Sequence, residues 1–214
     1  MGVQFHWHKG LNLEIDSMHK GFYRVPDMQF DLEKTKDALQ EVDSRVARQS
    51  PLGERDINAI CLTQIPGDPN SITGGNVRGL FWTRPDHTGV EVQRDDPIAE
   101  EKYSDFVKLF EDTYFKEIYD TLISRFRLGR IRLLWKLPRT TLSWHRDPEP
   151  RLHMPIITNP GAHMVIEEVS YHMPADGSVW ITNNTLYHTA FNGGEEDRVH
   201  LVATVLDCNM SIFD

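Results

Sequence analysis

The hydrophobic pattern of the chain changes near Gly129. Before this residue, the strongest apolar patterns recur every three or four residues. After it, short β-rich runs are separated by turn residues such as Pro138, Pro148 and Pro160. Spacing of three or four residues is typical of amphipathic helices, and short runs between Gly and Pro are typical of strands. The pattern therefore predicts helices and extra strands that support a β-rich second half.

Two helical regions are predicted before Gly129. Asp31 is a candidate N-cap for a helix that extends toward Pro51. Residues 97–126 form the strongest helical pattern, as one helix or as two with a break near Asp112, and Gly129 is the expected C-terminal stop. Period-two alternation and turn-bounded runs also predict strands at 3–8, 11–15, 57–64 and 77–83.

The second half contains about seven short strands, which favour an antiparallel sandwich or barrel. The clearest runs are 130–137, 140–145, 151–158, 162–168, 177–182 and 198–206. A length of 214 residues fits one domain. We therefore expect an α+β, mainly β, single domain over 1–214, in which 1–128 support a β core at 129–207.

Charge and composition narrow the classes of binding partner that the protein can have. The net charge of −9 argues against nucleic acid as a partner, because nucleic-acid binding needs basic surfaces. Between residues 121 and 158, however, eight basic residues stand against two acidic ones. Because Arg130, Arg132 and Lys136 alternate with apolar residues, we expect part of this charge on a solvated strand face. A positive local field would still attract an anionic ligand.

Location follows from what the sequence does not contain. Cys61 and Cys208 do not form a disulfide framework, the first residues carry no apolar signal region, and no apolar run approaches a membrane span. The expectation is a cytoplasmic protein without a membrane partner.

The residues that carry chemistry lie in the second half. His145 and Asp147 are two positions apart, so on a strand their side chains point to the same face. A third ligand from another strand, such as His188, would complete a two-histidine, one-carboxylate metal site, which is diagnostic of non-haem Fe(II) oxygenases. The pair alone, followed by Pro148, would be more typical of a surface turn.

Arg198 favours the metal site over the surface turn. It stands ten residues after His188, and a hairpin through 192–194 would return the chain beside the His188 strand. A buried guanidinium needs an anionic partner, and its planar fork suits a carboxylate. A metal with open positions beside such an arginine describes a site for 2-oxoglutarate. The alternative is that Arg198 pairs on the surface with an acidic neighbour in 195–197.

With these elements in place, residues 140–207 resemble the catalytic core of the aspartyl/asparaginyl β-hydroxylase-like group of Fe(II)/2-oxoglutarate dioxygenases, which includes free-proline hydroxylases. The shared elements are His145-x-Asp147, Arg151-Leu-x-Met154, Gly177-x-Val179, His188, Asn192 and Asp197-Arg198-x-His200-Leu201. The resemblance implies a double-stranded β-helix (jelly roll, cupin-type) core, with iron bound by His145, Asp147 and His188 and 2-oxoglutarate bound by Arg198. Some peptidyl members have Gly where Asp147 stands, so the carboxylate favours ordinary hydroxylation.

The resemblance also implies an activity. The expected reaction hydroxylates an unactivated C–H of an amino acid, free or peptidyl, with Fe(II), 2-oxoglutarate and O₂, and releases succinate and CO₂. Arg151 and His153 share strand parity and are candidate cosubstrate or substrate contacts. Alternatively, Arg151 pairs with Glu149. His200 lies near the 2-oxoglutarate carboxylate or is a packed core histidine.

Two other classes remain open. The first is a non-oxygenase cupin-type metal-binding protein, an isomerase or small-ligand sensor. His188 and Asn192 fit the end of the general cupin pattern, but His145-x-Asp147 replaces its His-x-His. The second class, a hydrolase, ranks last because the chain contains no G-x-S-x-G, H-E-x-x-H or P-loop motif. Candidate lids over the substrate pocket are 1–30, 66–76 and 84–96.

Overall fold

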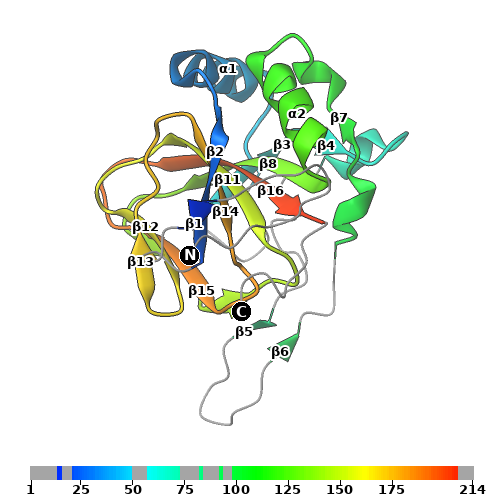
Figure 1. Cartoon of the computed structure of the whole chain (residues 1–214). Helices are drawn as coiled ribbons and strands as arrows, with labels where there is room; N and C mark the ends of the chain where they lie inside the picture. Colours follow the sequence, from blue (N-terminus) through cyan, green and yellow to red (C-terminus); the bar gives the residue numbers. More distant parts are fainter. Residues whose placement is uncertain are drawn as a thin grey trace.

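The computed structural model describes residues 14–15, 21–49, 57–72, 82–83, 92–93 and 98–206. The strand predicted at 3–8 lies outside these residues, as do most of those predicted at 11–15 and 77–83. Most of the three candidate lids also lies outside them. The described residues form two antiparallel sheets, a short ribbon and two α-helices (Figure 1).

The larger sheet has seven strands. From edge to edge they are β1 (Glu14–Ile15), β2 (Phe22–Gln29), β14 (Ser178–Thr182), β11 (Arg151–Ile157), β16 (Arg198–Val205), β8 (Leu128–Lys136) and β3 (Ile57–Cys61). Many spatial neighbours are far apart in sequence, as in a jelly roll. Residues 22–29, part of a candidate lid, are therefore a paired strand of this sheet, and that lid prediction is wrong for them.

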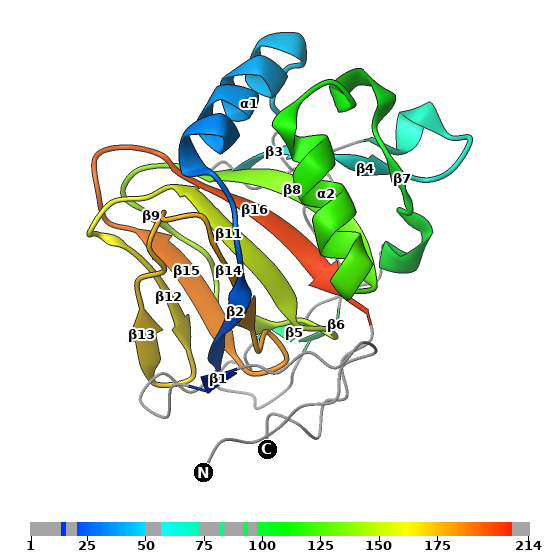
Figure 2. The ribbon, with the colours of Figure 1, turned by 45° about the horizontal axis from the view of Figure 1, so that its top comes forward.

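The smaller sheet lies opposite. Its strands are β13 (Val169–Tyr171), β12 (Ala162–Ile166), β15 (His188–Asn192), β10 (His145–Arg146), β5 (Trp82–Thr83) and β6 (Val92–Gln93), and β9 (Thr140–Thr141) pairs with β15. A separate ribbon joins β4 (Thr63–Gln64) to β7 (Asp105–Phe106). Figure 2 shows the two sheets as facing layers, with the helices outside the larger one. The α+β, mainly β, jelly-roll prediction is confirmed.

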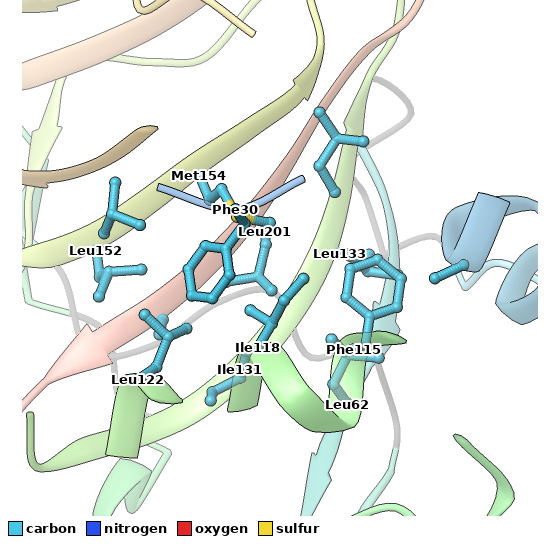
Figure 3. Packing of buried hydrophobic residues seen from close by; sticks show 14 of the residues in the cluster. Phe30, Leu62, Phe115, Ile118, Leu122, Ile131, Leu133, Leu152, Met154 and Leu201 are labelled. Carbon is cyan, nitrogen blue, oxygen red and sulfur yellow. The ribbon is translucent and has the colours of Figure 1, made fainter. Parts of the chain in front are cut away.

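Alternation along the strands divides the larger sheet into two faces. Leu152, Leu133 and Leu201 lie on the outer face, where they meet Phe115 and Ile118 of α2 (Tyr114–Arg125) (Figure 3). Full burial of such a side chain contributes about 1.5–3 kcal/mol. The outer face therefore forms the larger apolar core and leaves the inner face for other residues.

The inner face of the same strands is polar and buried. Arg130, Arg132 and Lys136 on β8 are 0%, 5% and 1% exposed, so the predicted solvated face is wrong. Arg130 donates to Glu100 at 3.1 Å inside the protein. β8 alternates as predicted, but its second face points into the jelly roll instead of into solvent. Trp180 on β14 shows that this face points toward the smaller sheet, because its side chain packs in one cluster with residues of β12.

The helices differ in part from prediction. Asp31 caps α1 (Leu32–Arg45) as expected, accepting bonds from two backbone N–H groups at 3.1 Å. Among residues 98–126, the described part of the second predicted helical region, only α2 is an α-helix. Before it stand the 3₁₀ turns η2 (Glu100–Lys102) and η3 (Lys108–Phe110), and β7, whose backbone pairs with β4. α2 does begin after a break at 111–113, but the segment before this break is not an α-helix, so the prediction of one or two helices is wrong for it. Within the described residues, no helix has the length and apolarity to cross a membrane.

Gly129 is not a helix stop. α2 ends at Arg125, and Gly129 lies within β8. A Cβ atom at this position would stand 2.9 Å from the backbone oxygen of Glu100. The glycine therefore allows Glu100 to approach the strand and to accept the backbone N–H of Arg130 at 3.1 Å.

The predicted hairpin between the His188 and Arg198 strands is also wrong. β15 belongs to the smaller sheet, whereas β16 lies in the larger sheet between β11 and β8. The side-chain amide of Asn192 donates to the backbone oxygens of Lys136 and Glu196, at 3.0 and 2.7 Å. These bonds fix the loop where the chain crosses between sheets. His188 and Arg198 thus reach the interior from opposite sheets.

Candidate active site

Three residues converge on the smaller sheet: His145 in β10, Asp147 just after it, and His188 at the start of β15. One ligand atom from each lies within 4.8 Å of the other two. Strand pairing explains the arrangement, because His145 stands opposite His188 in the antiparallel register and their ring centroids are 4.3 Å apart. The structure thus brings together the three predicted metal ligands.

Backbone carbonyls fix both imidazole rings. Nδ1 of His145 lies 2.7 Å from the oxygen of Ser143, and Nδ1 of His188 lies 3.0 Å from the oxygen of Leu186. A carbonyl only accepts, so each Nδ1 carries hydrogen and each Nε2 presents a lone pair in the neutral ring. Burial, together with the neighbouring His145, lowers the pKa of His188 to about 4. His188 is therefore neutral at pH 7.

Asp147 supplies the negative charge. Burial alone would raise the pKa of this carboxyl, but the guanidinium of Arg151 and the two histidines outweigh it, and the pKa lies below its ordinary value. Two neutral imidazoles and one ionised carboxylate are the donor set of non-haem Fe(II) sites with open positions. The residues present therefore fit the iron that the sequence implied.

Arg151 lies at the metal end of the interior. Its side chain is 6% exposed, and one terminal nitrogen stands 2.9 Å from Oδ2 of Asp147. The other terminal nitrogen donates to Thr204 at 3.0 Å and lies 3.4 Å from Glu149. Burial would lower the pKa of Arg151, yet these carboxylates raise it overall. The alternative pair with Glu149 exists, but the contact with Asp147 is shorter.

Arg198 lies in a different environment. Its Nε donates to Nε2 of His200 at 3.0 Å, and a terminal nitrogen lies 2.9 Å from Nδ1 of the same ring. Among the described residues, no carboxylate forms an ion pair with Arg198. Burial lowers its pKa to about 10. Two of the three acidic neighbours proposed as surface partners pair with other residues, Glu195 with Arg139 and Asp197 with Arg48.

His153 connects the two ends. Its Nδ1 lies 3.4 Å from Nδ1 of His200, and its buried Nε2 has no hydrogen-bond partner among the described residues. Burial holds the pKa of His153 well below its ordinary value, and the charges of Arg198 and Arg151 lower it further. His153 therefore lies within the electrostatic reach of both arginines. A buried cation and an unsatisfied ring nitrogen suit an anionic ligand.

Comparison with known proteins identifies the class. The family model for aspartyl/asparaginyl beta-hydroxylase matches residues 101–207, half of the chain. The chain belongs to the aspartyl/asparaginyl β-hydroxylase family. It is a 2-oxoglutarate-dependent hydroxylase. No curated protein matches its sequence.

Several solved structures are similar to this hydroxylase. An oxidoreductase of the 2OG-Fe(II) oxygenase family from Burkholderia pseudomallei shares 16% identity over 86% of this chain and 83% of that one, with a TM-score of 0.47. A prolyl hydroxylase from Trichoplax adhaerens, in complex with a peptide fragment of hypoxia inducible factor, shares 10% over 88% and 84%, with a TM-score of 0.47. A cupin domain from Bordetella pertussis shares 17% over 36% and 80%, with a TM-score of 0.32.

The hydroxylase also holds residues at the site that the sequence analysis did not single out. Asn184 is 4% exposed, and its side-chain nitrogen lies 2.9 Å from Nε2 of His188. Thr182 donates to Oδ1 of Asn184 at 2.6 Å. The only sequence signal was a polar turn four residues before a histidine. Asn192, which suggested a general cupin site, instead bonds to backbone oxygens at the crossing loop.

Proposed function

We propose that this hydroxylase binds Fe(II) through His145, Asp147 and His188 and binds 2-oxoglutarate through Arg198. Its substrate is an amino acid, free or within a peptide, in which an unactivated C–H is hydroxylated. We further propose that residues 1–214 act as one domain, with the core at 129–207. In support, residues of α1 and α2 pack in one apolar cluster with strands of the larger sheet.

The observation that carries the proposal is the convergence of three ligand atoms within 4.8 Å, with both Nδ1 atoms fixed by carbonyls. When bound, iron, 2-oxoglutarate and O₂ supply the oxidant for hydroxylation and yield succinate and CO₂. The protein provides position and electrostatics. His145 and His188 present lone pairs from rings that cannot rotate freely, and Arg151 holds Oδ2 of Asp147.

The far carboxylate of 2-oxoglutarate would neutralise Arg198. This guanidinium is buried beside two neutral histidines, so a bound carboxylate relieves an uncompensated charge. His153 offers its buried Nε2 to the same ligand, which deepens its predicted role in cosubstrate binding. Arg151 is a predicted contact of the cosubstrate or substrate, but its side chain pairs with Asp147. We propose that it positions this carboxylate as a metal ligand.

The test is a coupled assay. Purified protein with Fe(II), 2-oxoglutarate and O₂ is incubated with a panel of free amino acids and short peptides, and succinate and hydroxylated product are measured. His145→Ala is expected to remove turnover, whereas His163→Ala, a half-buried histidine of β12 outside the site, retains it. Equal turnover of His145→Ala and wild type would overturn the proposal. Retained zinc or manganese, without binding of 2-oxoglutarate, would support the non-oxygenase alternative.

A further inference from the structure

Asn184 touches both ends of the metal cluster. Its backbone oxygen accepts the N–H of Asp147 at 2.8 Å, and its side-chain nitrogen lies 2.9 Å from Nε2 of His188. It is 4% exposed, and the hydroxyl of Thr182 occupies its side-chain oxygen at 2.6 Å. The amide is therefore anchored by its oxygen and aims its N–H group at the metal cluster.

The orientation of this amide follows from the hydrogen bonds around it. The carbonyl of Leu186 fixes hydrogen on Nδ1 of His188, so Nε2 of the neutral ring must accept. Only the NH₂ end of Asn184 can donate to that lone pair. Its oxygen end then faces Thr182, whose hydroxyl donates to it.

We propose that Asn184 is a cosubstrate-binding residue, which donates its side-chain N–H to the metal-binding end of 2-oxoglutarate. The inference rests on the proposed function. An ion bound by His188 takes the lone pair that Asn184 now uses, and the anchored N–H then needs another acceptor. A buried donor left without one costs about 1–3 kcal/mol. Asp147 already shares one carboxylate oxygen with Arg151, so the oxygens of the cosubstrate are the acceptors that the chemistry of the site adds.

This role predicts opposite effects on metal and cosubstrate. In Asn184→Ala the backbone hydrogen bond from Asp147 persists, and the competition for Nε2 of His188 disappears. Affinity for Co(II) alone should stay equal or rise, while affinity for 2-oxoglutarate at the metal-loaded site should fall about tenfold, as for one lost bond to a charged group. Thr182→Val, which frees the amide oxygen, should weaken 2-oxoglutarate in the same direction by a smaller factor.

The experiment measures both affinities separately. Co(II) binding is followed by calorimetry and visible absorption, and 2-oxoglutarate binding by the anaerobic spectral change of the Fe(II) protein. A further variant, Asn184→Asp, replaces the side-chain N–H donor by a carboxylate. Its matched control is Asn183→Asp, whose carboxylate still accepts from Thr185 and adds the same charge one residue away. We expect tighter Co(II) and weaker 2-oxoglutarate binding only in Asn184→Asp.

The outcomes separate the two proposals. If wild type binds neither Co(II) nor 2-oxoglutarate, the proposed function fails. If wild type binds both, and Asn184→Ala binds both as wild type does, the role of Asn184 is overturned. A parallel loss of both affinities in Asn184→Ala, with a lowered melting temperature, would also overturn it, because that result marks a structural role alone.

Discussion

Arg151 and Arg198 occupy neighbouring strands of the same sheet and are both buried on its inner face, yet their surroundings differ. Arg151 stands 2.9 Å from Asp147, with Glu149 also in reach, and its pKa is raised. Arg198 has two neutral imidazoles beside it, and its pKa falls to about 10. One charge is compensated within the described protein, and the other is not.

The difference separates two uses of one residue type. A buried arginine paired with a carboxylate fixes that carboxylate in place. The desolvation of a buried arginine beside neutral groups is not offset until an anion binds to it. In the proposed function, the first positions a metal ligand, and the second provides binding energy for the cosubstrate.

The largest effect is expected at the paired arginine. Asp147→Leu removes a proposed metal ligand and leaves Arg151 without its nearest counter-ion, so turnover should be lost and the free energy of unfolding should fall by about 3–5 kcal/mol. The double variant Asp147→Leu, Arg151→Met removes both charges and should regain most of that stability without turnover. Urea unfolding and succinate release measure the two effects. A double variant as unstable as Asp147→Leu would contradict the pairing.

A second prediction applies one substitution at both arginines. Arg198→Met removes an uncompensated cation, so the metal-free protein should be as stable as wild type or more stable. Its KM for 2-oxoglutarate should rise about 10–100-fold, the value of bonds to a charged group. Arg151→Met is the matched control and should instead destabilise the protein. If Arg198→Met unfolds more readily than Arg151→Met, the division between the two arginines is wrong.

The sequence predicted the groups whose chemistry requires a residue type. The proposed metal ligands His145, Asp147 and His188 and the proposed anion-binding Arg198 are of this kind, so residue type, order and spacing were sufficient to nominate them. The resemblance to the hydroxylase family added the fold of the core. The partners of each arginine depend on which strands are neighbours, and the sequence did not determine this.

Two errors have the same cause. Arg130 and Arg132 alternate with apolar residues, a pattern that fits a solvated face and a polar interior equally well. The chain from His188 to Arg198 has the length and glycines of a hairpin, but it crosses between sheets. Asn184 was missed because an asparagine before a strand is typical of a turn. In each case the missing information was the position of the second sheet.

The smallest expected effect is a dependence of stability on pH, which arises from the two histidines beside Arg198. Burial and Arg198 hold the pKa values of His153 and His200 well below those of the unfolded chain. Below about pH 6.5 the unfolded state therefore binds protons that the folded state does not, so stability should fall as the pH falls, by about 1.4 kcal/mol per pH unit for each histidine. Neutral His188 adds a similar slope at the metal end. Asp147, with its lowered pKa, stays ionised in this range and adds none. Urea unfolding at pH 7.5, 6.5 and 5.5 measures this dependence. The free energy of unfolding of His153→Gln should fall less steeply with decreasing pH than that of wild type, by the slope of one histidine. Equal slopes in the two proteins would show that His153 is not buried as a neutral ring beside Arg198.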